Sequence, residues 1–372
     1  MGTDADSEVP GPAWYGWGDP TGGGGRPPGD GSGRREGLPP AARALLSDTI
    51  GLRGRATPPV PFDEVRTAAS ALSPAARAAL GTAVGTAHVA VDRAARIRHV
   101  GGKGYLDLVR IRRGDATGAP DGVVQPATHD EVLAVLRACE EHRVAVVPFG
   151  GGTSVVGGVA PASGGSRAVI TLDLRRMSRL VSVDRTALTA TFEPGMRGPE
   201  AERLLGAIGL TLGHFPQSYA FATLGGFAAT RSVGQASSGY GGFAELVEGL
   251  RVAAPAGTLE LGRAPASAAG PDLRALLVGS EGTLGVLTEL TLRVRPAPEV
   301  KVYEGWSFPT FEAGSAALRQ LAQVAAPGAL PDVARLSDAD ETRATLTLAP
   351  GRAARLLRGY LARRGRPRGS LL

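Results

Sequence analysis

The chain has 372 residues, which is enough for about two domains and for a large buried core without disulfide or metal staples. Its single cysteine, Cys139, excludes a disulfide framework and any multi-cysteine zinc or iron–sulfur site. No apolar run approaches ~18 residues, and the acidic start lacks the apolar segment of a secretory signal, so we expect no transmembrane helix and a cytoplasmic location.

The formal net charge of +6 comes from the C-terminal end. Residues 351–372 contain seven arginines and no acidic residue, so residues 1–350 sum to −1. We therefore predict no nucleic-acid partner, because the basic residues do not spread over a whole face. A solvated end and peripheral contact with an anionic membrane surface are two interpretations of this end that stay open.

Residues 1–40 are predicted to form an irregular arm. They combine a run of four glycines at 22–25 with Pro27, Pro28, Pro39 and Pro40 after it, and they contain Trp14-Tyr15-Gly16-Trp17-Gly18. Each tryptophan ring buries about 150–250 Å² when it docks, so we expect Trp14 and Trp17 to hold the arm against the body of the protein. Residues 41–114 follow as an Ala-rich helical segment that prolines interrupt.

Regular alternation of helices and strands begins near residue 120. Thr128 and Glu131 have the spacing of a capping box, which predicts a helix with Cys139 on its core face. We expect His129 and His142 on the surface of that helix. Strands are predicted at 145–147, 168–172, 180–183, 187–192 and 287–294, the last ended by Pro296 and Pro298, and further helices at 199–208 and 316–324. The mixture predicts an α+β fold.

A glycine-rich loop directly follows the predicted strand at 145–147. It reads Pro148-Phe149-Gly150-Gly151-Gly152-Thr153-Ser154-Val155-Val156-Gly157-Gly158. Its glycines allow a sharply turned backbone whose N–H groups converge on an anion, usually a phosphate. The hydroxyls of Thr153 and Ser154 add two more donors. A plain glycine-rich hairpin is the alternative interpretation of this loop taken alone.

Two common phosphate-binding motifs do not fit the loop. G-x-G-x-x-G would require glycine where Val155 stands, and G-x-x-x-x-G-K-[ST] would require lysine at Gly158. The loop is therefore neither a Rossmann dinucleotide turn nor a P-loop.

Three further glycine- or hydroxyl-rich loops follow in order at 216–226, 230–234 and 279–287. Together with 148–158 they resemble the FAD-binding loops of the p-cresol methylhydroxylase and vanillyl-alcohol oxidase family. Within that family, Trp14 to Gly18, Arg98-His99 and Tyr105 to Arg110 are similar to segments of the alkyldihydroxyacetonephosphate synthase branch. The resemblance is strongest over 95–345.

The resemblance implies a p-cresol methylhydroxylase-type FAD-binding domain of two α+β subdomains at 115–298. A partial α/β cap domain with a basic tail follows at 299–372. FAD is implied as a non-covalent cofactor, because the first loop has no histidine to link the flavin. The residues implied to bind FAD are Pro148, Phe149, Gly150, Gly151, Gly152, Thr153, Ser154, Gln217, Ser218, Thr223, Gly225, Gly226, Thr230, Arg231, Ser232, Glu281, Gly282, Gly285, Val286 and Leu287. Members of the family usually carry an acid where Gln217 stands.

In that branch the implied chemistry exchanges the acyl group of a dihydroxyacetone phosphate ester for a fatty alcohol, without net oxidation. Arg335 stands where the branch places an anchor for a substrate phosphate or carboxylate. Members of the branch continue well beyond residue 372, and their acid–base groups lie there. We therefore expect no catalytic acid or base within this chain, and FAD binding without efficient turnover.

Two other functions stay open: an FAD-dependent oxidase or dehydrogenase of a 2-hydroxy acid or similar alcohol, and an inactive FAD-binding fragment. The expected partner is a phosphorylated or carboxylated small molecule. The sequence also leaves open a homodimer.

Overall fold

The computed structural model describes residues 14–17, 40–52, 58–262, 268–324, 331–348, 352–364 and 370–371. The chain divides into two compact units. Unit 1 comprises residues 1–27, 58–234 and 241–297, and unit 2 comprises residues 28–57, 235–240 and 298–372. Each unit is described by itself.

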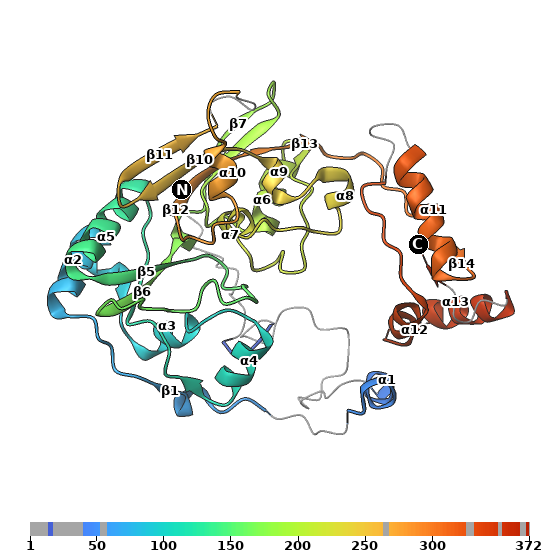
Figure 1. Cartoon of the computed structure of the whole chain (residues 1–372), viewed down its shortest axis with the longest axis horizontal. Coiled ribbons are helices and arrows are strands. Elements are labelled where there is room, and N and C mark those ends of the chain that lie inside the picture. The colour runs from blue at the N-terminus through green and yellow to red at the C-terminus, as the bar shows by residue number, and fades with distance from the viewer. Residues whose placement is uncertain are drawn as a thin grey trace, which may run out of the picture. The chain divides into compact units, whose positions relative to one another are not determined.

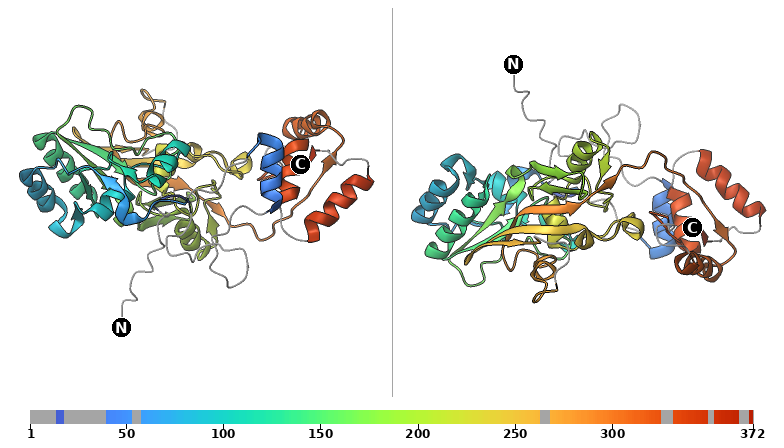
Figure 2. Two further views of the ribbon diagram at one scale, coloured as in Figure 1. Left: turned by 90° about the horizontal axis from the view of Figure 1, so that it is seen from below. Right: turned by 90° about the horizontal axis from the view of Figure 1, so that it is seen from above.

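The first half of unit 1 is a small, mainly parallel sheet with helices on it (Figure 1). The strand order is β2-β4-β6-β5, with β2 at Val89–Ala90, β4 at Gly122–Val124, β6 at Ala168–Asp173 and β5 at Val144–Phe149. The helices α2 (Pro74–Val84) and α5 (His129–His142) lie side by side at this sheet (Figures 1 and 2). Their apolar residues share one core with β4 and β6, and Cys139 lies in it as predicted.

The second half of unit 1 is a five-stranded antiparallel sheet. Its order is β11-β10-β12-β8-β7, with β11 at Gly257–Leu261, β10 at Val247–Ala254, β12 at Val286–Arg293, β8 at Thr189–Phe192 and β7 at Leu180–Asp184. Helices α6 (Gly198–Gly206), α7 (Leu224–Ala229), α9 (Phe243–Leu246) and α10 (Leu273–Leu277) accompany it. A second core joins β8, β10 and β12 to α6, α7 and α9. The two sheets thus form the two α+β halves that the sequence predicted.

Shorter elements complete unit 1. Helices α3 (Arg93–Arg98) and α4 (Tyr105–Arg112) lie near the parallel pair β1 (Arg66–Thr67) and β3 (Asp115–Ala116). Single 3₁₀ turns span Phe62–Glu64, Thr86–His88 and Leu174–Arg176. The strand predicted at 287–294 ends at Arg293, and Arg295–Pro296 forms a separate short strand, β13, antiparallel to β9 (Leu210–Thr211). Proline is tolerated there because it occupies an edge pairing of two residues.

The described part of the N-terminal arm packs on unit 1. The Trp14 ring lies 5.4 Å from the Phe62 ring, between ring centroids, and contributes to the cluster around Ile97 and Ile111. Trp17 is 45% exposed, with its ring centroid 6.3 Å from that of Phe221. The docking prediction is confirmed for Trp14 and holds only in part for Trp17.

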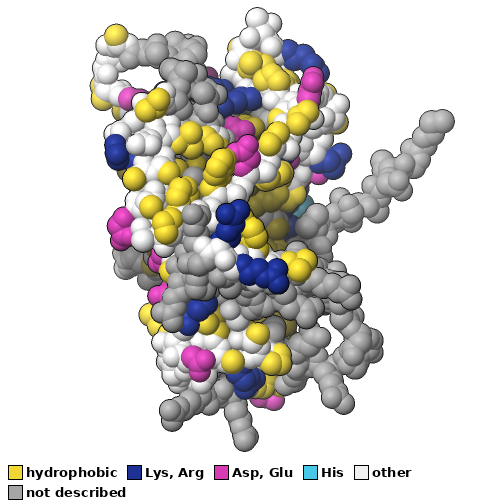
Figure 3. All heavy atoms as spheres, turned by 90° about the vertical axis from the view of Figure 1, so that its right-hand side faces the viewer, with side chains coloured by type: hydrophobic (Ala, Val, Ile, Leu, Met, Phe, Trp, Pro, Cys, Tyr) yellow, Lys and Arg dark blue, Asp and Glu magenta, His cyan; other side chains and the backbone are white. Residues whose placement is uncertain are grey.

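Unit 2 is mostly helical. It contains α1 (Pro40–Ile50), α8 (Ser237–Tyr240), α11 (Phe311–Val324), α12 (Ala339–Leu348), α13 (Arg352–Arg363) and the strand pair β14 (Ser307–Phe308) with β15 (Ser370–Leu371). Helix α1 contacts α12, so it belongs to this unit and not with the rest of the segment 41–114. The space-filling view in Figure 3 shows hydrophobic side chains exposed among charged ones. Tyr303, Val324 and Val302 are, in this order, the most exposed large hydrophobic residues among those described in unit 2.

The helix predicted after residue 127 has the expected start with one change. The Thr128 hydroxyl accepts a hydrogen bond from the Glu131 N–H at 3.1 Å. The Glu131 carboxylate, however, accepts from the N–H of Ala127 at 2.7 Å, one residue before the cap. The histidine prediction was wrong for His129, which is buried with its nitrogens 2.7 Å from the hydroxyls of Thr288 and Thr258. The five-stranded sheet covers this side of α5, and helix periodicity alone does not reveal that contact.

Candidate functional site

The glycine loop begins where β5 ends and presses its backbone against the segment 221–223. A Cβ atom on Gly150 would lie 2.2 Å from the Thr223 hydroxyl oxygen, and one on Gly151 would lie 2.0 Å from the Phe221 carbonyl oxygen. Gly152 has φ +66°, a conformation that L side chains rarely adopt. Only glycine therefore fits at these positions, and two loops 70 residues apart in sequence are in direct contact here.

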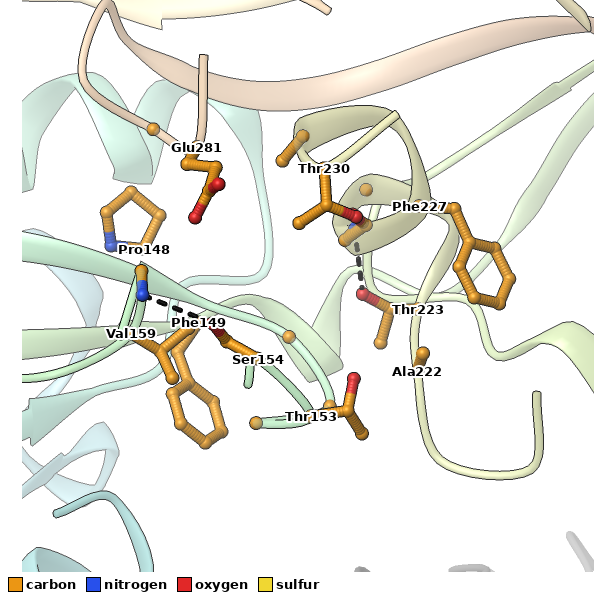
Figure 4. A pocket seen from close by; sticks show the side chains of 18 of the residues that line it. Pro148, Phe149, Thr153, Ser154, Val159, Ala222, Thr223, Phe227, Thr230 and Glu281 are labelled. Carbon is orange, nitrogen blue, oxygen red and sulfur yellow. Dashed lines mark hydrogen bonds between the residues drawn. The ribbon is translucent and has the colours of Figure 1, made fainter. Parts of the chain in front are cut away.

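The loop offers hydrogen-bond donors to the space in front of it. Within the described part of the chain, the N–H groups of Gly151, Gly152 and Thr153 have no protein acceptor. The Ser154 hydroxyl oxygen accepts the N–H of Gly158 at 3.1 Å, which folds the end of the loop back on itself (Figure 4). Gly152 is buried, and a buried backbone N–H without an acceptor is rare, so this arrangement fits an anion such as a diphosphate.

A cavity of about 430 Å³ lies in front of these donors. In Figure 4 the glycine loop and Glu281 stand on one side, and Ala222, Thr223, Phe227 and Thr230 stand on the other. Seventeen predicted cofactor-binding residues line this cavity: Pro148, Phe149, Gly150, Gly151, Gly152, Thr153, Ser154, Ser218, Thr223, Gly225, Gly226, Thr230, Ser232, Glu281, Gly282, Gly285 and Leu287.

Three predicted residues do not line the cavity. Gln217 is exposed beside it. Val286 is buried in the core of the parallel sheet. Arg231 donates from Nε to the Val278 carbonyl at 2.9 Å and from Nη2 to the Ala275 carbonyl at 2.6 Å. Each of these residues is a neighbour in sequence of a lining residue, but its side chain points elsewhere.

The cavity also has lining residues that the sequence did not single out. They are mostly apolar: Val155, Val156, Gly158, Val159, Leu174, Pro194, Ala222, Phe227, Ala229 and Ser280. Gly158 and the three valines belong to or adjoin the glycine loop and could have been included from their position. Leu174 and Pro194 come from turns between other elements, where no local pattern marks them.

The loop 279–281 is attached to the end of α7. The N–H groups of Gly279 and Glu281 each donate at 3.0 Å, to the carbonyls of Ala228 and Ala229. Glu281 adopts φ 51°, and its carboxylate lies close enough to Gly158 that a Cβ there would be 2.0 Å from Oε2. The segments 148–158, 222–232 and 279–287 thus meet around one space, as their order in the sequence suggested.

A buried charged network supports the glycine loop from behind. The Asp173 carboxylate is fully buried and lies 3.2 Å from His99 Nε2, while Arg175 Nε donates to it at 2.9 Å. Burial alone would raise the pKa of Asp173, but hydrogen bonds from His99 and Arg175 outweigh it and hold that pKa below its usual range. The His99 ring packs on Phe149, with centroids 4.6 Å apart, and Phe149 lies under Gly152.

Lys103 is a second buried charge near the loop. Its backbone N–H donates to the Ser154 carbonyl at 2.7 Å, and a Cβ on the preceding Gly102 would lie 2.0 Å from the same oxygen. Burial lowers the pKa of Lys103 to about 8, and the neighbouring Asp107 opposes that shift. The segment 102–104 therefore lies directly against the glycine loop.

Arg335 lies in unit 2, and it is not among the lining residues of the cavity. Its guanidinium forms an ion pair with Glu341 and remains largely exposed. No cluster of three or more possible metal ligands occurs among the described residues. In that part of the chain, none of the helices has the length and apolarity needed to cross a membrane.

Comparison with known proteins identifies the fold and its cofactor. Residues 120–262 match a family model described as an FAD binding domain. A solved alkyldihydroxyacetonephosphate synthase superposes with a TM-score of 0.82 at 30% identity, covering 96% of this chain and 69% of that one. The chain belongs to the alkyldihydroxyacetonephosphate synthase family. Its domain is of the FAD-binding p-cresol methylhydroxylase type, and a p-cresol methylhydroxylase structure shares the fold with a TM-score of 0.56 at 19% identity over 80% of this chain and 59% of that one.

Two named proteins are similar to this chain in sequence. The alkyldihydroxyacetonephosphate synthase of Trypanosoma brucei brucei is 41% identical over 256 residues, which cover 68% of this chain and 41% of that protein. A mitochondrial cytochrome D-lactate dehydrogenase of Arabidopsis thaliana is 37% identical over 197 residues, 52% of this chain and 34% of that protein. The chain thus matches less than half the length of these relatives.

The residues of the cavity fit FAD. Free N–H groups at Gly151 to Thr153 suit the diphosphate, and the apolar lining residues Val155, Val156 and Phe227 suit aromatic rings. When bound, FAD supplies a redox-active and electrophilic ring system, which protein side chains lack. The lining residues named above would bind and orient it.

Proposed function

We propose that this chain binds FAD non-covalently at the cavity of unit 1, with residues 115–298 as the binding domain. The observation that carries the proposal is the row of unpaired N–H groups at Gly151 to Thr153, three residues that line the cavity. The lining residues named above would hold the cofactor. The described lining contains no histidine or cysteine, the residues that most often link a flavin.

Binding is tested on the purified protein. It should be yellow, or take up added FAD with quenching of flavin fluorescence. Precipitation with acid should release all of the flavin into the supernatant. A folded protein that ignores FAD would contradict the binding proposal, and flavin that stays with the acid precipitate would contradict the non-covalent one.

We propose further that the bound FAD serves an alkylglycerone-phosphate synthase-like reaction, in which a fatty alcohol replaces the acyl group of an acyl dihydroxyacetone phosphate. The family assignment supports this class of substrate. Arg335 is the proposed anchor, because its exposed guanidinium already holds a carboxylate, that of Glu341, which a substrate phosphate would replace. An ether-bond assay on the flavin-loaded protein tests the reaction.

A matched pair of variants tests the anchor. Arg335→Gln should weaken binding of the phosphorylated substrate while the affinity for FAD stays at the parent value. Arg343→Gln removes an arginine of the same unit that pairs with Asp340, and it should change neither quantity. Equal substrate binding in both variants would contradict the role of Arg335.

Oxidation of a 2-hydroxy acid is the second candidate function. The 37% identity to a D-lactate dehydrogenase over 197 residues, about half of this chain, favours it. Reduction of an artificial electron acceptor in the presence of 2-hydroxy acids, without ether-bond formation, would select this candidate. Flavin binding with neither activity would select an FAD-binding protein without turnover.

Two partner hypotheses complete the proposal. Homodimerisation is tested by sedimentation of the flavin-loaded protein. Peripheral membrane contact through the arginine-rich end is tested by co-sedimentation with anionic vesicles at low and high salt, because binding of this kind weakens as salt screens the charges.

A further inference from the structure

The pair His214–Ser232 lies at the wall of the cavity. Ser232 lines the cavity, and its hydroxyl oxygen is 3.0 Å from His214 Nε2. The serine is fixed on both sides, because its N–H donates to the Phe227 carbonyl and its carbonyl accepts from the Phe243 N–H, each at 2.9 Å. Its hydroxyl group is therefore held where it can meet both His214 and a bound molecule.

His214 is buried behind that serine in an aromatic cage. Only 2% of it is exposed, and its ring centroid lies 5.0 Å from those of both Phe227 and Phe243. Burial lowers the pKa of His214 to about 4. The imidazole is therefore neutral at physiological pH and carries one N–H.

The position of that N–H follows from the surroundings. Nδ1 is buried and has no hydrogen-bond partner among the described residues. A buried N–H without an acceptor is rare in folded proteins and costs more than an unfilled acceptor position. The proton is therefore on Nε2, which donates to the Ser232 hydroxyl oxygen.

This donation decides what Ser232 offers to the cavity. Its oxygen is already used as an acceptor by His214, so its O–H is left to donate elsewhere. We propose that Ser232 is a dedicated hydrogen-bond donor toward an acceptor atom of the bound flavin dinucleotide, and that His214 is the positioning residue that keeps it a donor. The proposal rests on FAD being the occupant of the cavity.

A double-mutant cycle on FAD affinity tests the coupling. Ser232→Ala should weaken FAD binding about 3- to 10-fold, the loss expected for one neutral hydrogen bond. His214→Phe should weaken it by less, because the hydroxyl is then free to rotate. The double variant should match Ser232→Ala alone, since the histidine acts only through the serine.

Ser182→Ala is the matched control, because Ser182 is exposed on β7 and does not line the cavity. It should bind FAD with the parent affinity. Parent affinity in Ser232→Ala, or effects of the two single variants that multiply in the double variant, would overturn the proposal. A parent protein that does not bind FAD would instead overturn the proposed function, so the two failures are distinguishable.

A second set of ligands locates the acceptor. ADP-ribose has the adenosine and diphosphate of FAD but no flavin. If Ser232→Ala weakens FAD and ADP-ribose by the same factor, the acceptor lies on the diphosphate half. If it weakens FAD alone, the acceptor lies on the flavin half.

The protonated nitrogen is measured without any variant. In nitrogen-15 NMR of the labelled, flavin-loaded protein, His214 should carry its proton on Nε2 from pH 6 to pH 8. A proton on Nδ1 would overturn the assignment, because Ser232 would then donate to the histidine and not to the ligand. This readout does not depend on whether His214→Phe folds normally.

Discussion

At the scale of single residues, the site depends on glycines whose backbone lies so close to a neighbouring segment that no side chain would fit between them. Gly151 is the clearest position, because its backbone approaches the Phe221 carbonyl and the Ala222 Cα, at 2.0 and 2.8 Å from where a Cβ would stand. Both neighbours are backbone atoms, so neither can rotate away. The spacing between the two walls of the cavity is set by this contact.

Gly151→Ala should therefore weaken FAD binding at least 10-fold, because the loop must move away from the segment 221–223 and its N–H groups lose their alignment. Titration of the variant with FAD, followed by fluorescence, measures this. The control is Gly206→Ala at the end of α6, where a Cβ meets nothing within 4 Å. It should bind FAD normally and be as stable as the parent or more so by about 0.5–1 kcal/mol.

His214 also predicts how stability depends on pH. Its pKa is about 4 in the folded protein, below the ordinary value of 6.5. The unfolded chain therefore binds the proton more readily, and stability is lost as pH falls from 6.5 toward 4. The loss attributable to His214 between pH 7 and pH 5 should be about 2 kcal/mol.

Urea unfolding at these two pH values checks the prediction. His214→Phe should lose less stability than the parent over this interval, by about that amount. Other groups titrate in both proteins, so the decisive quantity is the difference between the stability lost by the parent and that lost by the variant. Identical losses would mean that His214 is protonated in the fold as easily as in the unfolded chain.

At the scale of secondary-structure elements, α5 connects the two sheets of unit 1. The start of the helix is determined locally by the Thr128 cap. Its packing on the antiparallel sheet involves His129, which contacts Thr288 of β12 and Thr258 of β11. One end of the helix thus follows from the sequence, and its packing follows from the second sheet.

Thr128→Ala should destabilise the protein by about 1 kcal/mol, because the Glu131 N–H loses its acceptor at the helix start. Thermal or urea unfolding of the variant measures the loss. Thr82→Ala is the control, because Thr82 is exposed within α2 and bonds only back to its own helix, at the Ala78 carbonyl. A loss of similar size in both variants would argue against a capping role for Thr128.

At the scale of the whole molecule, the cavity of unit 1 joins segments from both of its sheets. The glycine loop follows β5 of the parallel sheet, whereas Gly285 and Leu287 enter β12 of the antiparallel sheet. A ligand bound there contacts both halves, so it stabilises the unit as one body.

FAD should accordingly raise the melting temperature of the protein. At a free concentration 100 times its dissociation constant, a ligand that binds only the folded state adds about 2.7 kcal/mol. For a unit of this size that corresponds to roughly 5–10 °C. Differential scanning fluorimetry with and without FAD measures the shift, and AMP, which lacks the diphosphate and the flavin, should produce a smaller one.

The sequence by itself determined features that depend on neighbours along the chain. The four loops, the α+β pattern, the cap at Thr128 and the core position of Cys139 all follow from short motifs and periodicity. The twenty FAD-binding residues were implied by the resemblance of these loops to the family, and seventeen of them line the cavity.

Only the tertiary structure decided which side chains of each loop face the cavity and which buried residues pack against the loop. Arg231 points to the carbonyls of Val278 and Ala275, while its neighbours Thr230 and Ser232 face the cavity. The buried positions of His129 and His214, and the contact of His99 with Asp173, join residues 18 to 159 positions apart. The physical reason is that burial and hydrogen bonding across such separations arise from packing between elements, which no local pattern of residues encodes.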